Sequence, residues 1–188
     1  MAQNNNGFVS SSMATAEDIQ RRELSLATAQ GVLKQVERGL YCLPETWEDE
    51  YVITQHRFAR GIFSHDTVLY LLGLSDAAPE SLTMTFPRGY NTSKAKHAGI
   101  ATKSAPEGCF ELGMEALGTP YGNEVCAYEA ERSLCDMLRR TATPDVQIFN
   151  PSIKAYPSSA ERSIPKLQSY AKKLGVTKKM NAYLEILL

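Results

Sequence analysis

Apolar and polar residues in the first 45 positions change their spacing every few residues. Residues 7–10 suggest a short extended segment, whereas residues 12–17 and 19–30 have helical spacing. Residues 33–43 form two strand-like stretches around Arg38-Gly39, the pattern of a β-hairpin. Helix, helix and hairpin in this order predict a winged helix-turn-helix over residues 1–45.

Small residues mark where these predicted helices begin and end. Ser10, Ser11 and Ser12 can each accept a hydrogen bond from an unpaired N–H at a helix start. Gly31 suits the position that follows a helix. Only six residues precede Gly7, so the first helix of a winged helix-turn-helix is expected to be missing.

The rest of the chain predicts a mixed domain over residues 52–188 that ends in helices, which makes the fold class α+β. Residues 44–50 are polar and predict a linker, and Ser64 is expected to cap an apolar helix over residues 65–72 that ends before Gly73. Residues 82–87 alternate like a strand that Pro87 stops. The remaining predictions are short strands near Gly99, Gly108, Gly113 and Gly122, a helix after Glu129, and helices over residues 164–174 and 178–188.

The net charge of −1 conceals an uneven distribution along the chain. Residues 46–130 hold 6 basic and 11 acidic residues, whereas residues 131–188 hold 10 basic and 5 acidic residues. Such a basic end indicates either an anionic partner or simply a solvated helix face. Hydrophobic residues make up 43% of the chain, with no apolar run long enough for a membrane span.

Cysteine usage and the N-terminal residues favour a cytoplasmic location. Cys42, Cys109, Cys126 and Cys135 are far apart in the sequence, which is typical of structural thiols rather than of a zinc site or a disulfide framework. Residues 1–6 lack the charged and apolar regions of a secretory signal. We therefore expect a cytoplasmic protein that does not bind a membrane.

No catalytic, metal-binding or cofactor-binding pattern is found in the sequence. The phosphate-binding and dinucleotide-binding glycine loops and the serine nucleophile elbow are absent. The chain has 3 histidines, and His65-Asp66 fits the first turn of a helix better than a metal site. Glu131 at a helix start and Arg132 with Asp136 one turn apart predict structural roles. We expect no enzymatic activity, metal or cofactor.

Residues 7–44 resemble the winged helix of the AbiEi-type antitoxin family. The family pattern begins with a glycine, two apolar residues and two hydroxyl residues, and later has an isoleucine that opens the recognition helix. The residues that carry it here are Gly7-Phe8-Val9-Ser10-Ser11, Ile19, Gly31-Val32-Leu33, Val36 and Glu37-Arg38-Gly39-Leu40-Tyr41-Cys42-Leu43-Pro44.

The second part of the chain resembles the same family in four further segments, whose order and spacing together are specific. These are Ser64-His65-Asp66-Thr67-Val68-Leu69 with Leu72-Gly73-Leu74-Ser75-Asp76 and Pro79, then Thr85-Phe86-Pro87-Arg88-Gly89-Tyr90-Asn91, then Thr119-Pro120-Tyr121-Gly122-Asn123-Glu124-Val125, and finally Tyr128-Glu129-Ala130-Glu131-Arg132-Ser133-Leu134-Cys135-Asp136.

The resemblance implies a type IV antitoxin that also represses its own operon. Its first domain would bind inverted repeats of double-stranded DNA in its own promoter, which would place two copies on one operator; the oligomeric state is left open. Its second domain would neutralise a nucleotidyltransferase-like toxin. The alternatives are a protein-interaction module and a stand-alone transcriptional regulator without antitoxin activity.

Two sets of residues are the candidate contacts. Recognition helices meet base edges in the major groove with their first turns, and a cation at a wing tip reaches phosphates or the minor groove. The predicted DNA contacts are Ser10, Ser11, Gln20, Arg21, Arg22, Ser25, Lys34 and Arg38. The predicted contacts with the toxin are the cations of the basic end, Arg139, Arg140, Arg162, Lys166, Lys172, Lys173, Lys178 and Lys179.

Overall fold

The computed structural model describes residues 1–139, 146–159 and 162–187. The chain divides into two compact units. Unit 1 comprises residues 1–59 with residues 118–125, and unit 2 comprises residues 60–117 with residues 126–188. Helices and strands both contribute substantially, so the fold is mixed α+β, as expected. Whether residues 1–45 and 52–188 act as separate functional domains stays a prediction.

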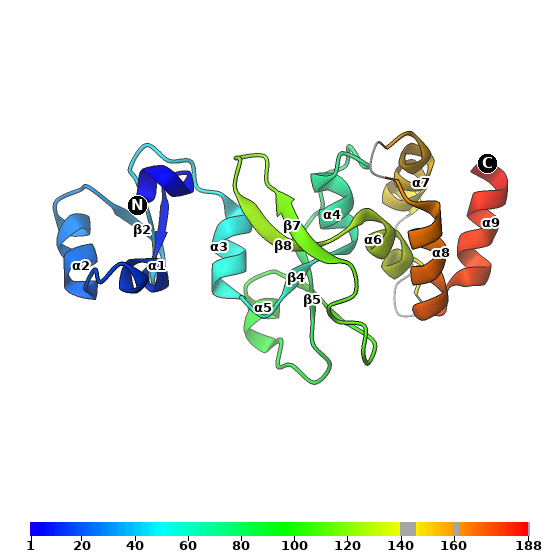
Figure 1. Ribbon diagram of the computed structural model, residues 1–188, viewed down its shortest axis with the longest axis horizontal. Coiled ribbons are helices and arrows are strands. Elements are labelled where there is room, and N and C mark those ends of the chain that lie inside the picture. The colour runs from blue at the N-terminus through cyan, green and yellow to red at the C-terminus, as the bar shows by residue number, and fades with distance from the viewer. Residues whose placement is uncertain (140–145, 160–161, 188) are drawn as a thin grey trace. The chain divides into compact units, whose positions relative to one another are not determined.

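Unit 1 has a small antiparallel sheet with strand order β1-β3-β2. Figure 1 labels its strand β2 and the helices α1 and α2. The predicted extended segment, two helices and hairpin are confirmed with shifts of one or two residues at their ends. A 3₁₀ turn, η1, precedes the first strand. The elements are η1 (Ala2–Asn5), β1 (Phe8–Ser10), α1 (Ser11–Ala16), α2 (Arg21–Ala29), β2 (Lys34–Glu37), β3 (Leu40–Cys42) and α3 (Glu50–Arg57).

The sheet of unit 1 is covered on both faces, because side chains alternate along its strands. Val9 and Tyr41 share a cluster with Ala14 of α1 and Leu24 of α2. The next residues along the strands, Phe8, Leu40 and Cys42, form a second cluster that includes Val52 and Ile53 of α3. All three α-helices of unit 1 therefore pack against this sheet.

The prediction that residues 44–50 are a linker is wrong at its end. The side chain of Asp49 is fully buried and caps α3 by accepting hydrogen bonds from the backbone N–H groups of Tyr51, at 2.9 Å, and Val52, at 3.3 Å. Its other oxygen accepts bonds from Thr119 and Asn123, which lie about 70 residues further along the chain. These distant donors cannot be inferred from local polarity, which is why the sequence pattern suggested a solvated segment.

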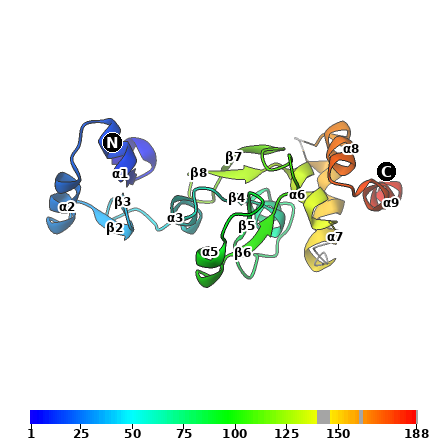
Figure 2. The ribbon, with the colours of Figure 1, turned by 90° about the horizontal axis from the view of Figure 1, so that it is seen from below.

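Unit 2 contains a five-stranded mixed sheet with strand order β6-β5-β4-β8-β7. Strand β4 runs antiparallel to β5 and parallel to β8, and β5 runs parallel to β6. The predicted strand over residues 82–87 is confirmed as β5, and α5 (Ser93–His97) lies beside β6 (Figure 2). The strands are β4 (Ile62–Phe63), β5 (Thr83–Phe86), β6 (Ala101–Ser104), β7 (Met114–Gly118) and β8 (Glu124–Tyr128).

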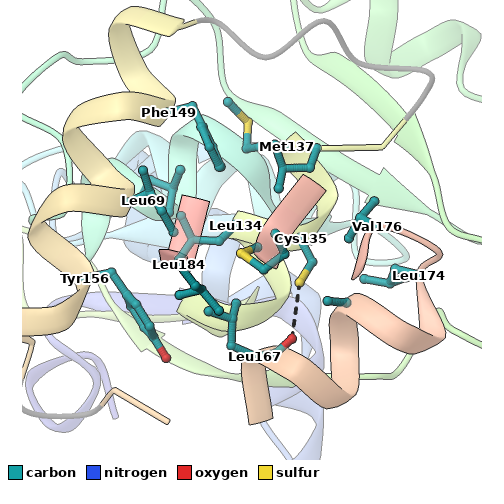
Figure 3. Close-up of a cluster of buried hydrophobic side chains, with 14 of the residues drawn as sticks. Leu69, Leu134, Cys135, Met137, Phe149, Tyr156, Leu167, Leu174, Val176 and Leu184 are labelled. Carbon is teal, nitrogen blue, oxygen red and sulfur yellow. Dashed lines mark hydrogen bonds between the residues drawn. The ribbon is translucent and has the colours of Figure 1, made fainter. Parts of the chain in front are cut away.

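The largest hydrophobic cluster of unit 2 surrounds α6, which packs against α4, α7 and α8. Figure 3 shows Leu134 and Cys135 of α6 among side chains from these helices and from α9. The predicted helices after Glu129 and near residues 164 and 178 are confirmed, whereas α7 and α5 were not predicted. The helices of this cluster are α4 (His65–Leu71), α6 (Ala130–Met137), α7 (Val146–Ala155), α8 (Ile164–Lys173) and α9 (Thr177–Leu187), with a 3₁₀ turn η2 (Tyr156–Ser158) after α7.

Ser64 stands before α4 as predicted, but its hydroxyl does not cap the helix. The hydroxyl accepts a hydrogen bond from Thr85 Oγ1 at 2.8 Å and lies 3.0 Å from His65 Nδ1. The prediction that Ser64 caps the helix is therefore wrong. Its hydroxyl contacts Thr85 of β5 and the ring of His65 instead of the backbone N–H groups of the first turn. His65 itself has a positive φ of 56°, an uncommon backbone conformation for a residue other than glycine.

Candidate functional site

The first turn of α2 presents two exposed arginines. Arg21 and Arg22 follow Gln20, whose backbone N–H donates to Glu23 Oε2 at 2.9 Å and so completes the helix start. Within the described part of the chain, neither arginine takes part in an ion pair. Leu24 of the same helix is buried against the sheet. Burial of Leu24 fixes one face of α2, and both guanidinium groups remain available to an anionic ligand.

The hairpin between β2 and β3 carries the third exposed arginine of unit 1. Arg38 and Gly39 form the turn, and Gly39 has a φ of +78° that favours glycine. The backbone carbonyl of Arg38 lies 3.2 Å from His56 Nε2 of α3. This contact positions the turn, while the guanidinium group has no ion-pair partner among residues that the structure describes.

Apart from Gln20, which is exposed, the other predicted DNA contacts of unit 1 have partners or are buried. Ser10 is 8% exposed, and its hydroxyl caps α1 by accepting from the backbone N–H of Met13. The Ser11 hydroxyl is buried and has no hydrogen-bond partner among the described residues. Ser25 Oγ donates to the carbonyl of Arg21 at 3.1 Å. Lys34 Nζ lies 2.9 Å from Glu48 Oε1, a hydrogen bond that raises the pKa of Lys34.

Unit 2 contains a fully buried ion pair in α6. Arg132 Nε donates to Asp136 Oδ2 at 2.8 Å, and both side chains are 0% exposed. Arg132 Nη1 donates to the carbonyls of Cys109 and Leu112, and the guanidinium lies 4.2 Å from the centre of the Tyr128 ring. Burial raises the pKa of Tyr128. The predicted structural pairing of Arg132 with Asp136 is confirmed, and these contacts tie α6 to the loop before β7.

Two glutamates at the start of α6 accept hydrogen bonds from the C-terminal helices. Glu129 accepts from Lys166 Nζ and from the Tyr170 hydroxyl of α8. Glu131 accepts from the Tyr156 hydroxyl at 2.7 Å and from the backbone N–H of Ser163 at 2.9 Å. The sequence suggested only that Glu131 suits a helix start. The structure adds partners from up to 41 residues away, which join α6 to α8.

The cations predicted to bind the toxin fall into two groups. Three hold the fold together: Lys166 pairs with Glu129, Arg139 lies 3.3 Å from Asp136 Oδ1, and Lys179 donates to the carbonyl of Leu138 at 2.9 Å. Arg140 lies outside the described residues. Arg162, Lys172, Lys173 and Lys178 are exposed and have no ion-pair partner among the residues that the structure describes, and the three lysines flank the turn between α8 and α9.

The described residues show no group of three histidine, cysteine or acidic side chains that could hold a metal ion. Cys42 and Cys135 are buried, and burial raises the pKa of Cys135 to about 12, so its thiol stays protonated at neutral pH. In the ranges that the structure describes, no helix has both the length and the apolar character needed to cross a bilayer.

Comparisons with known proteins include a similarity to a solved structure. No protein-family model and no curated protein matches the chain. The crystal structure of the RV2827C protein from Mycobacterium tuberculosis is similar, with a TM-score of 0.58 and 14% sequence identity. The match covers 91% of this chain and 68% of that one. At this identity the likeness shows that the two proteins share a fold.

Proposed function

We propose that this chain is an antitoxin of the AbiEi type that binds the DNA of its own promoter and counteracts a nucleotidyltransferase-like toxin. The observation that carries the DNA-binding part is the group of exposed, unpaired arginines on α2 and the hairpin, namely Arg21, Arg22 and Arg38. The element order β1, α1, α2, β2, β3 supports it, because a winged helix places its recognition helix directly before the hairpin.

This arrangement leads to a proposed set of contacts between unit 1 and DNA. The first turn of α2 would enter the major groove, where an arginine bonds to O6 and N7 of guanine with two N–H groups. Arg38 at the hairpin tip would contact a phosphate. Gln20 belongs to the same exposed surface. The sequence resemblance to the AbiEi-type antitoxins supports the assignment to that family.

The antitoxin role is proposed for the part of the chain after residue 52. The exposed lysines Lys172, Lys173 and Lys178 flank one turn, and a basic surface suits a toxin with acidic metal ligands or with nucleotide phosphates. The protein is proposed to act in the cytoplasm, where such a toxin would meet its substrates, and to have no catalytic activity of its own.

An electrophoretic mobility shift with the DNA upstream of its gene tests the first part of the proposal. We expect a shift that weakens as salt rises and that requires the inverted repeats. Absence of salt-sensitive binding would exclude the repressor role. Nuclease or nucleotidyl-transfer turnover by the pure protein, abolished by a point mutation in it, would contradict the non-catalytic assignment.

Co-expression with the neighbouring toxin gene tests the second part. The full chain carrying Arg21→Ala and Arg22→Ala is expected to rescue growth, whereas the chain with Lys172, Lys173 and Lys178 changed to Glu is expected to rescue less. Circular dichroism of both variants controls for folding. If the arginine variant fails to rescue although it is folded, antitoxicity does not reside in the part of the chain after residue 52.

A second candidate function is a protein-interaction module that does not bind DNA. The observation that favours it is the 3₁₀ turn η1, which stands before β1 where a winged helix carries its first α-helix. The mobility shift separates the two candidates, because an interaction module would leave the promoter DNA unshifted while still rescuing growth.

A further inference from the structure

Unit 2 contains a cavity of about 460 Å³ that none of the roles above uses. It is lined by His65 at the start of α4, Lys103 and Ser104 of β6, Arg88 of the segment after β5, and Arg139 after α6. The volume falls in the range of small-molecule pockets, about 300–1,000 Å³. From the sequence, Arg139 was predicted to contact the toxin, whereas Arg88 and Lys103 were not among the predicted contacts.

Arg139 brings excess positive charge to the lining of this cavity. Asp136 accepts hydrogen bonds from two guanidinium groups, Arg132 at 2.8 Å and Arg139 at 3.3 Å. One carboxylate therefore compensates two arginines, and one positive charge remains. Arg139 Nη1 also lies 3.4 Å from the carbonyl of Ser104, and its side chain is only 18% exposed. Its guanidinium is thus held in place before any ligand arrives.

Lys103 adds a second positive charge to the cavity lining. In the ranges that the structure describes, Lys103 of β6 has no ion-pair partner. Lys103 and Arg139 line the cavity together with His65, and their positive charges contribute to lowering the pKa of His65. Arg88 is paired with Glu107 at 3.2 Å, but both side chains are largely exposed, and such pairs are weak in water. An anion in the cavity could therefore recruit Arg88.

His65 supplies a neutral donor to the same cavity. Burial lowers the pKa of His65 to about 4, so the ring is uncharged at neutral pH. The buried Ser64 hydroxyl accepts from Thr85 and lies 3.0 Å from His65 Nδ1, and we assign the serine as the donor in this pair. That arrangement places the imidazole proton on Nε2, for which the described residues offer no other partner. The groups that face the cavity are then predominantly hydrogen-bond donors.

We propose that this cavity binds the phosphate group of a small phosphorylated molecule such as a nucleotide. Phosphate oxygens accept charge-assisted hydrogen bonds from several donors at once, which suits the guanidinium of Arg139, the ammonium of Lys103 and Nε2–H of His65. The cavity is larger than a single phosphate ion needs, so room remains for the organic part of the ligand. This inference stands independently of DNA binding by unit 1.

Isothermal titration calorimetry of the full chain tests the proposal with inorganic phosphate, pyrophosphate, adenosine monophosphate and adenosine. We expect saturable binding of the phosphate-containing probes and none of adenosine. Tighter binding of the nucleotide than of the inorganic ions would identify a nucleotide as the ligand class. Equal binding would identify the free anion. Absence of saturable binding by all four probes would overturn the proposal.

Matched variants locate the site. Lys103→Gln and Arg88→Gln should each weaken phosphate binding, by about tenfold for Lys103→Gln, because each removes one charged donor. Lys154→Gln removes an exposed lysine of α7 that does not line the cavity and should leave phosphate binding unchanged. Equal weakening by all three variants would mean non-specific attraction and would overturn the site. Loss of promoter binding in Lys103→Gln without any phosphate binding would assign the cavity to DNA and would overturn it as well.

Discussion

Arginine has different surroundings in the two units. Arg21 and Arg22 of unit 1 are exposed and lack ion-pair partners within the described residues. Arg132 of unit 2 is 0% exposed and is held by Asp136, two carbonyl groups and the ring of Tyr128. A charge in water is available to a partner, whereas a charge removed from water is costly unless the fold surrounds it with acceptors. Arg21 and Arg22 are therefore available to a partner, whereas Arg132 has an architectural role.

The hydrophobic clusters of the two units also differ. Unit 1 has two small clusters on the two faces of a three-stranded sheet. Unit 2 includes an extended cluster to which α4, α6, α7, α8 and α9 contribute. Small clusters leave a larger share of the residues at the surface. A larger share of the residues of unit 1 thus lies at the surface, where they can contact a partner. The packed helices of unit 2 can instead enclose polar groups.

Removing the acidic partner of the buried pair is expected to have the largest effect. Asp136→Asn should lower the free energy of unfolding by about 3–5 kcal/mol, because Arg132 would remain as an uncompensated buried charge. Arg21→Ala, the matched change in unit 1, should alter it by less than about 0.5 kcal/mol. Urea denaturation followed by circular dichroism measures both values. Similar losses in the two variants would contradict the division between architectural and available charge.

Acidification should act on unit 2 through His65. The folded pKa of about 4 lies below the ordinary value of 6.5, so between these values the unfolded chain binds a proton that the folded chain does not. Stability should therefore fall as pH drops from 6.5 to 4, by about 3 kcal/mol from this residue. His65→Asn, chosen because asparagine tolerates a positive φ, should reduce this dependence. Denaturation midpoints at pH 7 and pH 4.5 measure it; an unchanged dependence in the variant would assign the effect to other groups.

Loss of one α2 arginine should affect DNA binding without affecting the fold. Arg21→Ala or Arg22→Ala should weaken promoter binding by about 1–3 kcal/mol if that guanidinium contacts a guanine. Lys172→Ala in unit 2 is the control and should bind the promoter like the unchanged protein. Fluorescence anisotropy with labelled promoter DNA gives the affinities. Equal loss in the lysine variant would indicate that binding follows overall charge rather than α2.

Arg38→Ala should have the smallest effect, and its effect should not depend on DNA sequence. Removing this cation from the hairpin tip leaves one phosphate without its partner, which should reduce the slope of log affinity against log salt by about 1. Anisotropy titrations at several salt concentrations, with promoter DNA and with a scrambled duplex, measure the slopes. A change confined to the promoter duplex would assign Arg38 to base recognition instead.

The sequence by itself determined the elements whose signals are local. The caps and glycines around residues 10–43 predicted α1, α2 and the hairpin of unit 1, since these signals depend on neighbours a few positions away. The i,i+4 spacing of Arg132 and Asp136 predicted their ion pair for the same reason. Arg21 and Arg22 could be predicted as DNA contacts from their position in the first turn of α2 alone.

Only the tertiary structure decided where the remaining polar groups find partners. Asp49 binds Thr119 and Asn123, Ser64 accepts from Thr85, and Glu129 accepts from Lys166. Each partner comes from a distant segment, so local spacing carried no information about it. Helix α7 was missed because Pro151 lies inside it, and proline normally argues against a helix interior. Burial in the cluster around α6 outweighs that local preference, because the packing of many side chains exceeds the cost at one position.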